Sequence, residues 1–372
     1  MDWTFFKELL SRDSTSGQER EVADWLWQRL EAPGKQLFEV GDGTANLLLS
    51  WGVPKLVFCT HMDTVPPYIP PHFPEGMPSG GTPFASLTPA PPTADAAGPS
   101  PCPCPGVDKS PEGHSFGDAI YGRGSCDAKG QLFAMYEACK RLEAEGCSDF
   151  GLLLLAGEET GSWGAKAFAK TDFRAPYLIV GEPTENKLVS AAKGTLSYDL
   201  VFRGEPFHSG YPQYGVSAVD LFHQFYSRLK AKDFGLDPVL GETTWNVGLL
   251  QSDNPQNILS PELRCRLYFR TTFLSHEAVQ VWMSGQQGED ASLTVSARGG
   301  DVPSQYWVPE GFDSAPVAFG SDAPHLSNFT HKGIVGPGSI RFAHRADEHI
   351  LVRDLESAVD QYVRLYHSLA AN

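Results

Sequence analysis

Four short apolar runs constrain the fold of this chain more than any other feature of its sequence. They occupy residues 46–51, 55–60, 151–156 and 177–180. Each run is too short for a helix and is bounded by Gly, Pro or charged residues, so we expect four buried strands. A strong helical pattern at residues 128–145 separates the second run from the third. Strand and helix therefore alternate as they do around a parallel sheet, which places the chain in the α/β class.

The rest of the chain adds further elements with a different pattern. From about Glu185, apolar and polar residues alternate as in half-buried antiparallel strands. The additional elements that we expect are helices within residues 2–31, at 217–229 and at 351–370, and strands at 196–202, 245–250 and 263–270. The middle of the chain therefore resembles a small α+β insert.

Two domains are the natural expectation for 372 residues. We assign residues 1–184 and 300–372 to one domain, with a mixed, largely parallel sheet and flanking helices, and residues 185–299 to the insert. Residues 66–111 contain 15 prolines and almost no aliphatic periodicity, so they lack the apolar area to offset the entropy of ordering. We therefore interpret residues 66–118 as an irregular loop insertion in the first domain.

Composition limits the classes of partner. A formal net charge of −16 argues against nucleic acid and against an anionic membrane, because both require clustered Lys and Arg. We find no apolar run that could cross a bilayer and no secretory signal, so we expect a cytoplasmic protein. The seven cysteines include no CxxC pair, which indicates reduced thiols, and we take the close pair Cys102 and Cys104 as incidental.

Acidic and imidazole side chains follow three of the expected strands. His61 and Asp63 follow the second run, Glu158 and Glu159 the third, and Glu182 the fourth. Parallel sheets build their sites where strands end at the carboxyl edge. Adjacent glutamates after a buried strand are costly unless a cation or hydrogen bonds compensate them. We therefore expect metal ions at this edge.

Asp127 and His344 complete the candidate metal set. Asp127 lies where a Gly-rich turn enters a helix, so its carboxylate could bridge two ions. A phosphate-binding turn is the alternative for residues 121–130, but no GKS or GKT follows and nearby acids would repel phosphate. The expected ligand sets are His61, Asp127 and Glu182 for one ion, and Asp127, Glu159 and His344 for the other. Imidazoles and carboxylates without thiolate are typical of hydrolytic zinc, and two ions about 3.5–4 Å apart could share a water.

These motifs resemble those of the acetylornithine deacetylase, succinyl-diaminopimelate desuccinylase, aminoacylase and glutamate carboxypeptidase family of dinuclear zinc amidohydrolases. The resemblance covers nearly the whole chain except the Pro-rich insertion. It implies that Asp63 orients the metal-binding His61, that Glu158 is the general base and that Glu159 is a ligand. Deacylases and carboxypeptidases of the family have Glu at the position of Glu182, whereas many aminopeptidases have Asp.

The resemblance also implies that residues 185–299 form a lid and dimerisation domain. His208 matches a histidine that completes the active site, often that of the partner subunit, and would stabilise an oxyanion. Asn257 and Arg270 resemble residues that bind the substrate carboxylate. Two features depart from the family pattern, namely Ala128 in place of Met or Leu after the bridging aspartate, and the long Pro-rich insertion.

The sequence therefore predicts a metal-dependent hydrolase of N-acyl amino acids. The segment around His344 is closest to acetylornithine deacetylase-like members, which implies a substrate such as N-acetylornithine and a role in arginine biosynthesis. We expect two Zn²⁺ ions, which Co²⁺ could replace, and a homodimer. The alternatives are a dipeptidase or carboxypeptidase acting on short peptides, and a binding protein without activity. The presence of every ligand and of Glu158 argues against the last of these.

Overall fold

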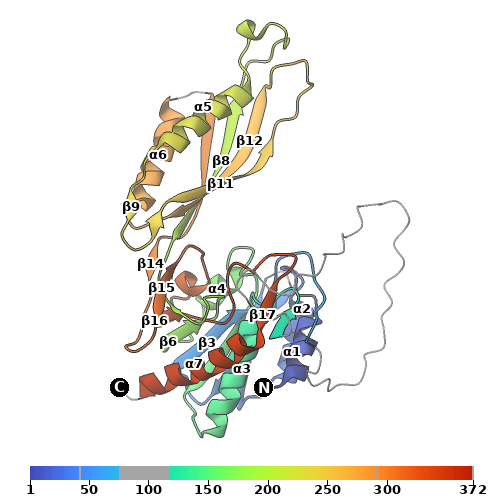
Figure 1. The fold of residues 1–372 in the computed structure, drawn as a ribbon, viewed down its shortest axis with the longest axis vertical. Coiled ribbons are helices and arrows are strands. Elements are labelled where there is room, and N and C mark those ends of the chain that lie inside the picture. The colour runs from blue at the N-terminus through green and yellow to red at the C-terminus, as the bar shows by residue number, and fades with distance from the viewer. Residues whose placement is uncertain (42, 75–117, 290–291, 371–372) are drawn as a thin grey trace, which may run out of the picture. The chain divides into compact units, whose positions relative to one another are not determined.

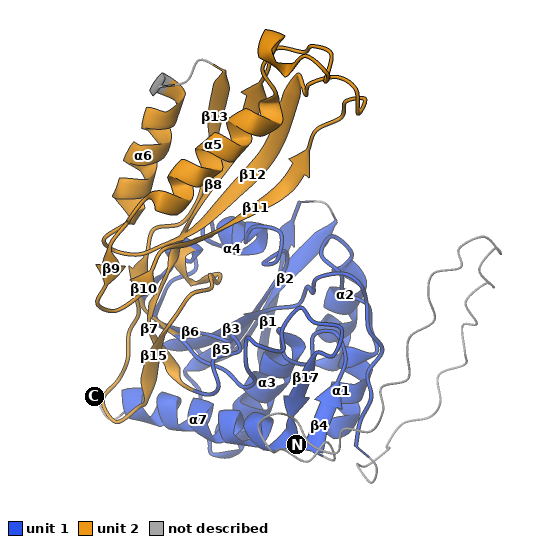
Figure 2. Cartoon of the chain, turned by 45° about the horizontal axis from the view of Figure 1, so that its top comes forward, with its two compact units in different colours: residues 1–186, 325–330, 334–372 blue, residues 187–324, 331–333 orange. Residues whose placement is uncertain are grey.

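A computed structural model describes residues 1–41, 43–74, 118–289 and 292–370 (Figure 1). The chain forms two compact units (Figure 2). Unit 1 comprises residues 1–186, 325–330 and 334–372, and unit 2 comprises residues 187–324 and 331–333. None of the helices in the described part is long and apolar enough to cross a membrane.

A six-stranded sheet forms the centre of unit 1, in the order β1-β2-β5-β3-β6-β16. Its strands are β1 (Gly34–Val40), β2 (Thr44–Trp51), β3 (Leu56–His61), β5 (Phe150–Leu155), β6 (Ala175–Val180) and β16 (Phe329–Ile334). β3 is parallel to both β5 and β6, whereas β2 is antiparallel to β1 and to β5. The predicted mixed, largely parallel α/β sheet is confirmed. A separate pair is formed by β4 (Ala119–Tyr121) and β17 (His349–Leu351).

The central strands β3 and β5 are buried along their whole length because both faces of the sheet are covered. Every residue of β3 and β5 is buried. Continuous apolar runs are typical of parallel strands that lie between two layers of helices. The sequence of β5, Phe-Gly-Leu-Leu-Leu-Leu, therefore contains no polar residue that could face solvent.

The described part of unit 1 contains five α-helices: α1 (Trp3–Leu10), α2 (Arg20–Arg29), α3 (Lys129–Ala144), α4 (Trp163–Phe168) and α7 (Val352–Ala370). α3 lies against the sheet and alongside α7 (Figure 1). α3 is buried on nearly all sides, from Lys129 to Cys139. α7 packs on the sheet through aromatic contacts, with the rings of Tyr362 and Phe58 5.4 Å apart.

Unit 2 is built around an antiparallel sheet in the order β11-β12-β8-β13. Its strands are β8 (Gly194–Arg203), β11 (Thr244–Gln251), β12 (Glu262–Thr271) and β13 (Leu293–Gly299). Buried residues alternate along β8 and β12, as expected when one face is covered. The helices α5 (Ala218–Ala231) and α6 (His276–Glu289) contribute Phe225, Leu229, Val279 and Met283 to this core.

Several short elements complete unit 2. They are β7 (Leu188–Ala192), η2 (Pro212–Tyr214), β9 (Leu236–Asp237), β10 (Gly241–Glu242), β14 (Ser304–Gln305) and β15 (Ser314–Val317), with η3 (Ala323–His325) at the boundary. β14 and β15 pair on either side of β7. Residues 300–324, which the sequence analysis assigned to the first domain, therefore cluster with unit 2, because their partner strand belongs to it.

Most of the expected Pro-rich insertion, residues 75–117, lies outside the described residues. The segment before it packs against unit 1. His72 and Tyr121 exchange backbone hydrogen bonds of 3.0 and 2.9 Å, and the rings of Phe73 and Phe6 lie 6.0 Å apart. The described cysteines, Cys59, Cys126, Cys139, Cys147 and Cys265, are free, and Cys102 and Cys104 lie outside the described residues.

Candidate metal centre

Two parallel strands bring His61 and Glu182 to the same edge of the sheet in unit 1. His61 is the last residue of β3, and the register pairs Cys59 of β3 with Val180 of β6. His61 and Glu182 each lie two residues beyond that pair. Both are buried, with 1% and 5% of the residue exposed. Both residues therefore lie at the same buried edge of the sheet.

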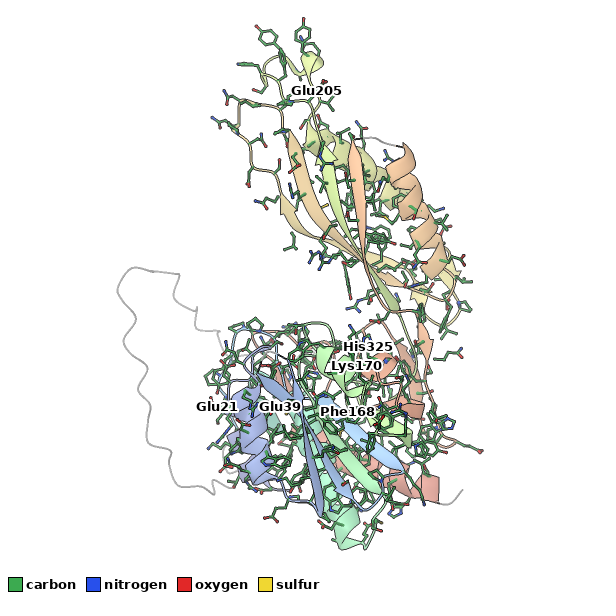
Figure 3. All side chains as sticks on the ribbon, turned by 180° about the vertical axis from the view of Figure 1, so that it is seen from behind. Glu21, Glu39, Phe168, Lys170, Glu205 and His325 are labelled. Carbon is green, nitrogen blue, oxygen red and sulfur yellow. The ribbon has the colours of Figure 1, made fainter. Side chains whose placement is uncertain are left out.

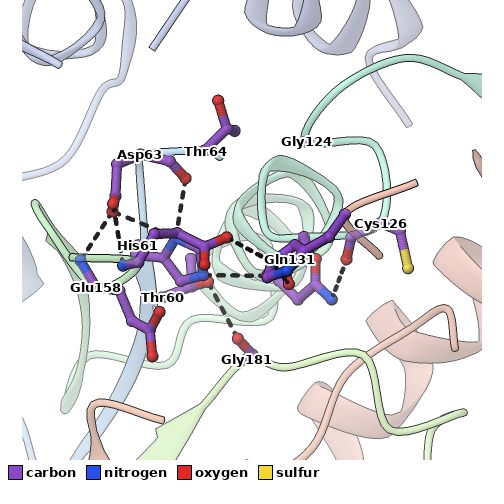
Figure 4. A network of polar contacts seen from close by, with 12 residues as sticks. Thr60, His61, Asp63, Thr64, Gly124, Cys126, Gln131, Glu158 and Gly181 are labelled. Atoms are coloured by element: carbon purple, nitrogen blue, oxygen red, sulfur yellow. Dashed lines mark hydrogen bonds and ion pairs between the residues drawn. The ribbon is translucent and has the colours of Figure 1, made fainter. Parts of the chain in front are cut away.

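The loop after β5 is held at this edge by Asp63. β5 is in register with β3 up to Leu155, and Glu158 and Glu159 follow. The two oxygens of Asp63 accept the backbone N–H groups of Glu158 at 3.0 Å and of Glu159 at 3.1 Å (Figure 4). The hydroxyl of Ser16 also donates to Asp63, at 2.7 Å. This fully buried carboxylate therefore fixes the backbone of both glutamates.

Asp127 lies at the centre of the group, and its two oxygens face different imidazoles. Oδ1 lies 3.2 Å from Nε2 of His61, and Oδ2 lies 3.3 Å from Nε2 of His344. Oε1 of Glu159 lies 2.9 Å from the same nitrogen of His344. The His344 backbone is left-handed, with φ of 63°, and its side chain is about half exposed. This is the arrangement that a carboxylate bridging two cations requires.

The loop that carries Asp127 is organised by Glu348. Oε1 of Glu348 accepts backbone N–H groups from Gly124, Cys126 and Asp127 at 3.0, 3.1 and 3.1 Å. Its other oxygen accepts from the guanidinium of Arg123 at 2.5 Å, and both side chains of this pair are buried. A carboxylate that accepts several N–H groups in a dry environment fixes the backbone that donates them.

Ser16 and Glu348 were not predicted from the sequence. Ser16 lies in a stretch interpreted only as a turn, and Glu348 lies 221 residues from Asp127, the nearest in sequence of its three backbone donors. The only hint in the sequence is that Glu348 follows His344 closely. Both contacts join segments far apart in the chain, so the tertiary fold is needed to find them.

The charges in the group shift one another's pKa values. Burial opposes the charged form of His61, but hydrogen bonds with Asp127 and Asp63 outweigh burial and hold its pKa well above the usual value. Hydrogen bonds with Asp127 and Glu159 raise the pKa of His344 to about 10. Burial favours the neutral form of Asp127, yet the two imidazoles lower its pKa. The imidazoles and the carboxylates of this group therefore stabilise one another's charged forms.

The other three candidate residues belong to unit 2, at opposite ends of its sheet. His208 and Asn257 are exposed neighbours: His208 bridges to Ile258, and the N–H of Ser209 donates to the carbonyl of Asn257 at 2.9 Å. This segment lies beyond the end of β8, where Figure 3 labels Glu205. Arg270 pairs with Thr195 at the start of β8. Its guanidinium lies 5.0 Å from the centroid of the Tyr268 ring.

Comparison with known proteins decides the family. The model of the Peptidase family M20/M25/M40 matches residues 108–368, which is more than half of the chain. The chain belongs to this M20 family. It is therefore a hydrolytic enzyme related to metallopeptidases.

Relatives along the whole chain agree with the M20 assignment. A peptidase M20 domain-containing protein of Schizosaccharomyces pombe is 29% identical over 372 residues, covering 96% of this chain and 82% of the relative. A protein of Aspergillus flavus named "Probable carboxypeptidase" is 28% identical over 401 residues, which cover 97% of this chain and 86% of the relative.

Solved M20-type structures share the fold. A tripeptidase of Staphylococcus aureus matches with a TM-score of 0.71 and 17% identity, covering 97% of this chain and 95% of that one. A dinuclear metal-binding peptidase of the M20 family from Bacillus subtilis matches with a TM-score of 0.62 and 12% identity, and the match covers 97% of this chain and 95% of that one. The α/β architecture is therefore that of M20 catalytic domains.

The residues in unit 1 fit the metal that an M20 enzyme would bind. The donor atoms of His61, Asp127 and Glu159 all lie within 4.8 Å of one another. The thiol of the neighbouring Cys126 instead donates to the carbonyl of Ser339, at 3.3 Å. Nitrogen and oxygen donors without thiolate suit a hydrolytic divalent cation, and carboxylates this closely packed gain from its charge.

Proposed function

We propose that this protein is a zinc-dependent amidohydrolase that cleaves the amide bond on the nitrogen of an amino acid with a free carboxylate. The observation that carries the proposal is Asp127, whose two oxygens face His61 and His344 separately, 3.2 and 3.3 Å away. His61, Asp127 and Glu182 would hold one ion, and Asp127, Glu159 and His344 the other. When bound, two such ions supply Lewis acidity, which lowers the pKa of a coordinated water and polarises a carbonyl.

The protein's own residues would divide the remaining work. Glu158 would take the proton of the attacking water and deliver it to the leaving amine. Asp63 would keep Glu158 in place by accepting the backbone N–H of Glu158. The carboxylate of Asp63 would also orient His61, whose Nδ1 lies 3.4 Å from it. In unit 2, His208 would stabilise the oxyanion, and Asn257 and Arg270 would bind the carboxylate of the substrate.

The leading substrate class is N-acyl amino acids of the acetylornithine type. Glu182, rather than Asp, at the end of β6 supports deacylation or carboxypeptidase activity over aminopeptidase activity. A carboxypeptidase or dipeptidase is the second candidate, because the name of the Aspergillus flavus relative favours it. Both activities cleave next to a residue with a free carboxylate and differ only in the acyl part.

A homodimer is part of the proposal, and the geometry of unit 2 supports it. Arg270 pairs with Thr195, and His208 lies beyond Arg203 at the other end of β8. Eight residues of extended strand separate these ends, which is roughly 26 Å at about 3.3 Å per residue. One copy of unit 2 cannot bring both side chains to one small substrate, so two copies would share each site.

A substrate panel on the zinc-loaded protein tests the proposed function. We expect turnover of N-acetyl amino acids, no turnover of their carboxyl-amidated forms, and loss of turnover in Glu158→Gln with metal content unchanged. Turnover of dipeptides alone would select the second candidate. Equal turnover of the free and the carboxyl-amidated forms, or turnover that survives in Glu158→Gln, would contradict the proposal.

A further inference from the structure

A second group of metal-ligating side chains lies in unit 1, away from Asp127, where the ends of α3 and α7 meet. It contains Glu145, Cys147 and His367, and their donor atoms all lie within 4.8 Å of one another. Nε2 of His367 lies 2.8 Å from Oε2 of Glu145. Glu145 and His367 are exposed and Cys147 is half-buried, so a cation could reach them from solvent.

The backbone that carries two of these side chains is rigid. α3 ends in a Schellman motif: the N–H of Cys147 donates to the carbonyl of Leu142 at 3.0 Å, and the N–H of Gly146 to that of Glu143 at 2.9 Å. Gly146 has the left-handed φ of 83° that this motif requires. Glu145 and Cys147 therefore occupy fixed positions on either side of Gly146, where a residue with a side chain would strain the backbone.

The third side chain is fixed by its own helix. His367 lies in the last turn of α7, next to Tyr366. The hydroxyl of Tyr366 donates to Asp149, and its ring packs edge-on against Phe150 at 5.7 Å. The end of α7 is thereby anchored to the segment that follows Cys147. Little reorganisation is needed to bring the three donors to one ion.

The local electrostatics favour a cation. α3 and α7 both end here, and the carbonyl groups at the C-terminus of a helix carry partial negative charge. Asp149 and Asp360 add negative charge, whereas Lys55 and Arg141 add positive charge. Nε of Arg141 lies 3.4 Å from Oε1 of Glu145, which leaves Oε2 of that carboxylate to face His367.

We propose that Glu145, Cys147 and His367 bind a thiophilic divalent cation such as Zn²⁺. The thiol of Cys147 releases its proton to solvent as the sulfur–metal bond forms, and no electron is transferred. One sulfur, one nitrogen and one oxygen donor suit zinc, with water in the fourth position. The ion joins the end of α7 to the end of α3, so its role is to hold these two helix ends of unit 1 together.

Cobalt substitution separates this site from the metal centre at Asp127. A thiolate bound to Co²⁺ gives an intense charge-transfer absorption in the near ultraviolet, and the ligands proposed around Asp127 include no sulfur. We expect this absorption in the Co²⁺-loaded full-length chain. It should disappear in Cys147→Ser, with one equivalent of metal lost per chain and hydrolase activity unchanged, and it should weaken in His367→Ala.

The matched control is the double variant Cys102→Ser/Cys104→Ser, which should keep the absorption. Loss of the absorption in this control, its persistence in Cys147→Ser, or its absence from the unmodified protein would each overturn the proposal. Retained activity in Cys147→Ser shows that the variant is folded, so a missing absorption there cannot be attributed to unfolding.

Discussion

At the scale of single residues, the position of Asp127 depends on Glu348. This one carboxylate accepts three backbone N–H groups of the loop that carries Asp127 and pairs with buried Arg123. Glu348 is therefore a positioning residue whose effect on metal binding passes through Asp127.

We expect Glu348→Gln to weaken metal binding about 10- to 100-fold, because groups that orient ligands contribute on that scale. The substitution leaves Arg123 buried without its charge partner, which costs about 3–5 kcal/mol of stability. Isothermal calorimetry and urea unfolding measure the two effects. The neighbouring exposed pair of Arg345 and Asp347 is the control, and Asp347→Asn should change stability by less than about 1 kcal/mol. Equal effects of the two substitutions would contradict the role of Glu348.

The pKa of His344 predicts opposite pH trends for the metal-free and metal-bound protein. Its folded pKa is about 10 and its usual value 6.5, so its contribution to stability is fully present below pH 6.5 and is lost as pH rises through 10. Metal binding displaces this proton, so metal affinity should rise over the same interval. Unfolding of the chelated protein and competitive metal titration at several pH values test both trends. The His344→Ala variant isolates the group, and identical trends in this variant would contradict the assignment.

At the scale of elements, the start of α3 must approach the Asp127 loop closely. A Cβ at Gly130 would lie 2.2 Å from the backbone oxygen of Ser125 and 3.0 Å from the side chain of Ile350. Only glycine allows this approach, so the helix and the loop are fixed to one another by contact of their backbones. The N-terminal end of α3 is therefore coupled to the metal centre.

We expect Gly130→Ala to destabilise the protein by about 1–3 kcal/mol through overpacking and to reduce metal affinity. Gly285→Ala is the matched control, because Gly285 lies in α6 with nothing within 4 Å of an added Cβ. Alanine there should be neutral or should stabilise by up to about 1 kcal/mol through helix propensity. Thermal unfolding and metal titration of both variants provide the comparison, and a harmless Gly130→Ala would show that the close approach is dispensable.

The elements also show what the sequence can predict. β3 and β5 leave nearly continuous apolar runs and α3 leaves a helical pattern, so all three could be predicted from the sequence. β7, β14 and β15 were not found, because strands of two to five residues gain their stability from pairing rather than from local pattern. That pairing also explains why unit 2 extends to residue 324.

The residues around Asp127 were found for a related reason. His61, Glu159 and Glu182 follow strand ends, which periodicity reveals, and Asp127 follows a Gly-rich turn. The roles of Ser16 and Glu348 instead depend on contacts across 47 and more than 200 residues. The division of the ligands between two ions, and the tasks of Glu158 and His208, stay predictions until metal and activity are measured.

At the scale of the whole molecule, each unit has its own sheet and core, and the proposed chemistry draws on both. Unit 1 contains the carboxylates and imidazoles around Asp127, and unit 2 contains His208, Asn257 and Arg270. The separation of His208 from Arg270 along β8 makes the proposed site dependent on a second copy of the chain.

Complementation between two inactive variants tests this dependence. His208→Ala and Glu158→Gln chains with different affinity tags can be co-expressed and the mixed dimer purified. We expect about half of the activity of the unmodified dimer, because one of the two sites would receive an intact Glu158 and an intact His208 from different chains. An inactive mixed dimer would show that His208 acts within its own chain, and full activity of the His208→Ala homodimer would show that it does not act at all.

The most direct test of the central claim, a dinuclear metal centre around Asp127, is metal reconstitution of the chelated Cys147→Ser variant, which lacks the proposed sulfur ligand. Zn²⁺ is added in steps while hydrolysis of an N-acetyl amino acid and bound metal are measured. We expect activity to be absent without metal and to reach its maximum at two equivalents per chain, and we expect Asp127→Asn to bind neither ion tightly. Full activity without metal, or two tightly bound ions in Asp127→Asn, would contradict this claim.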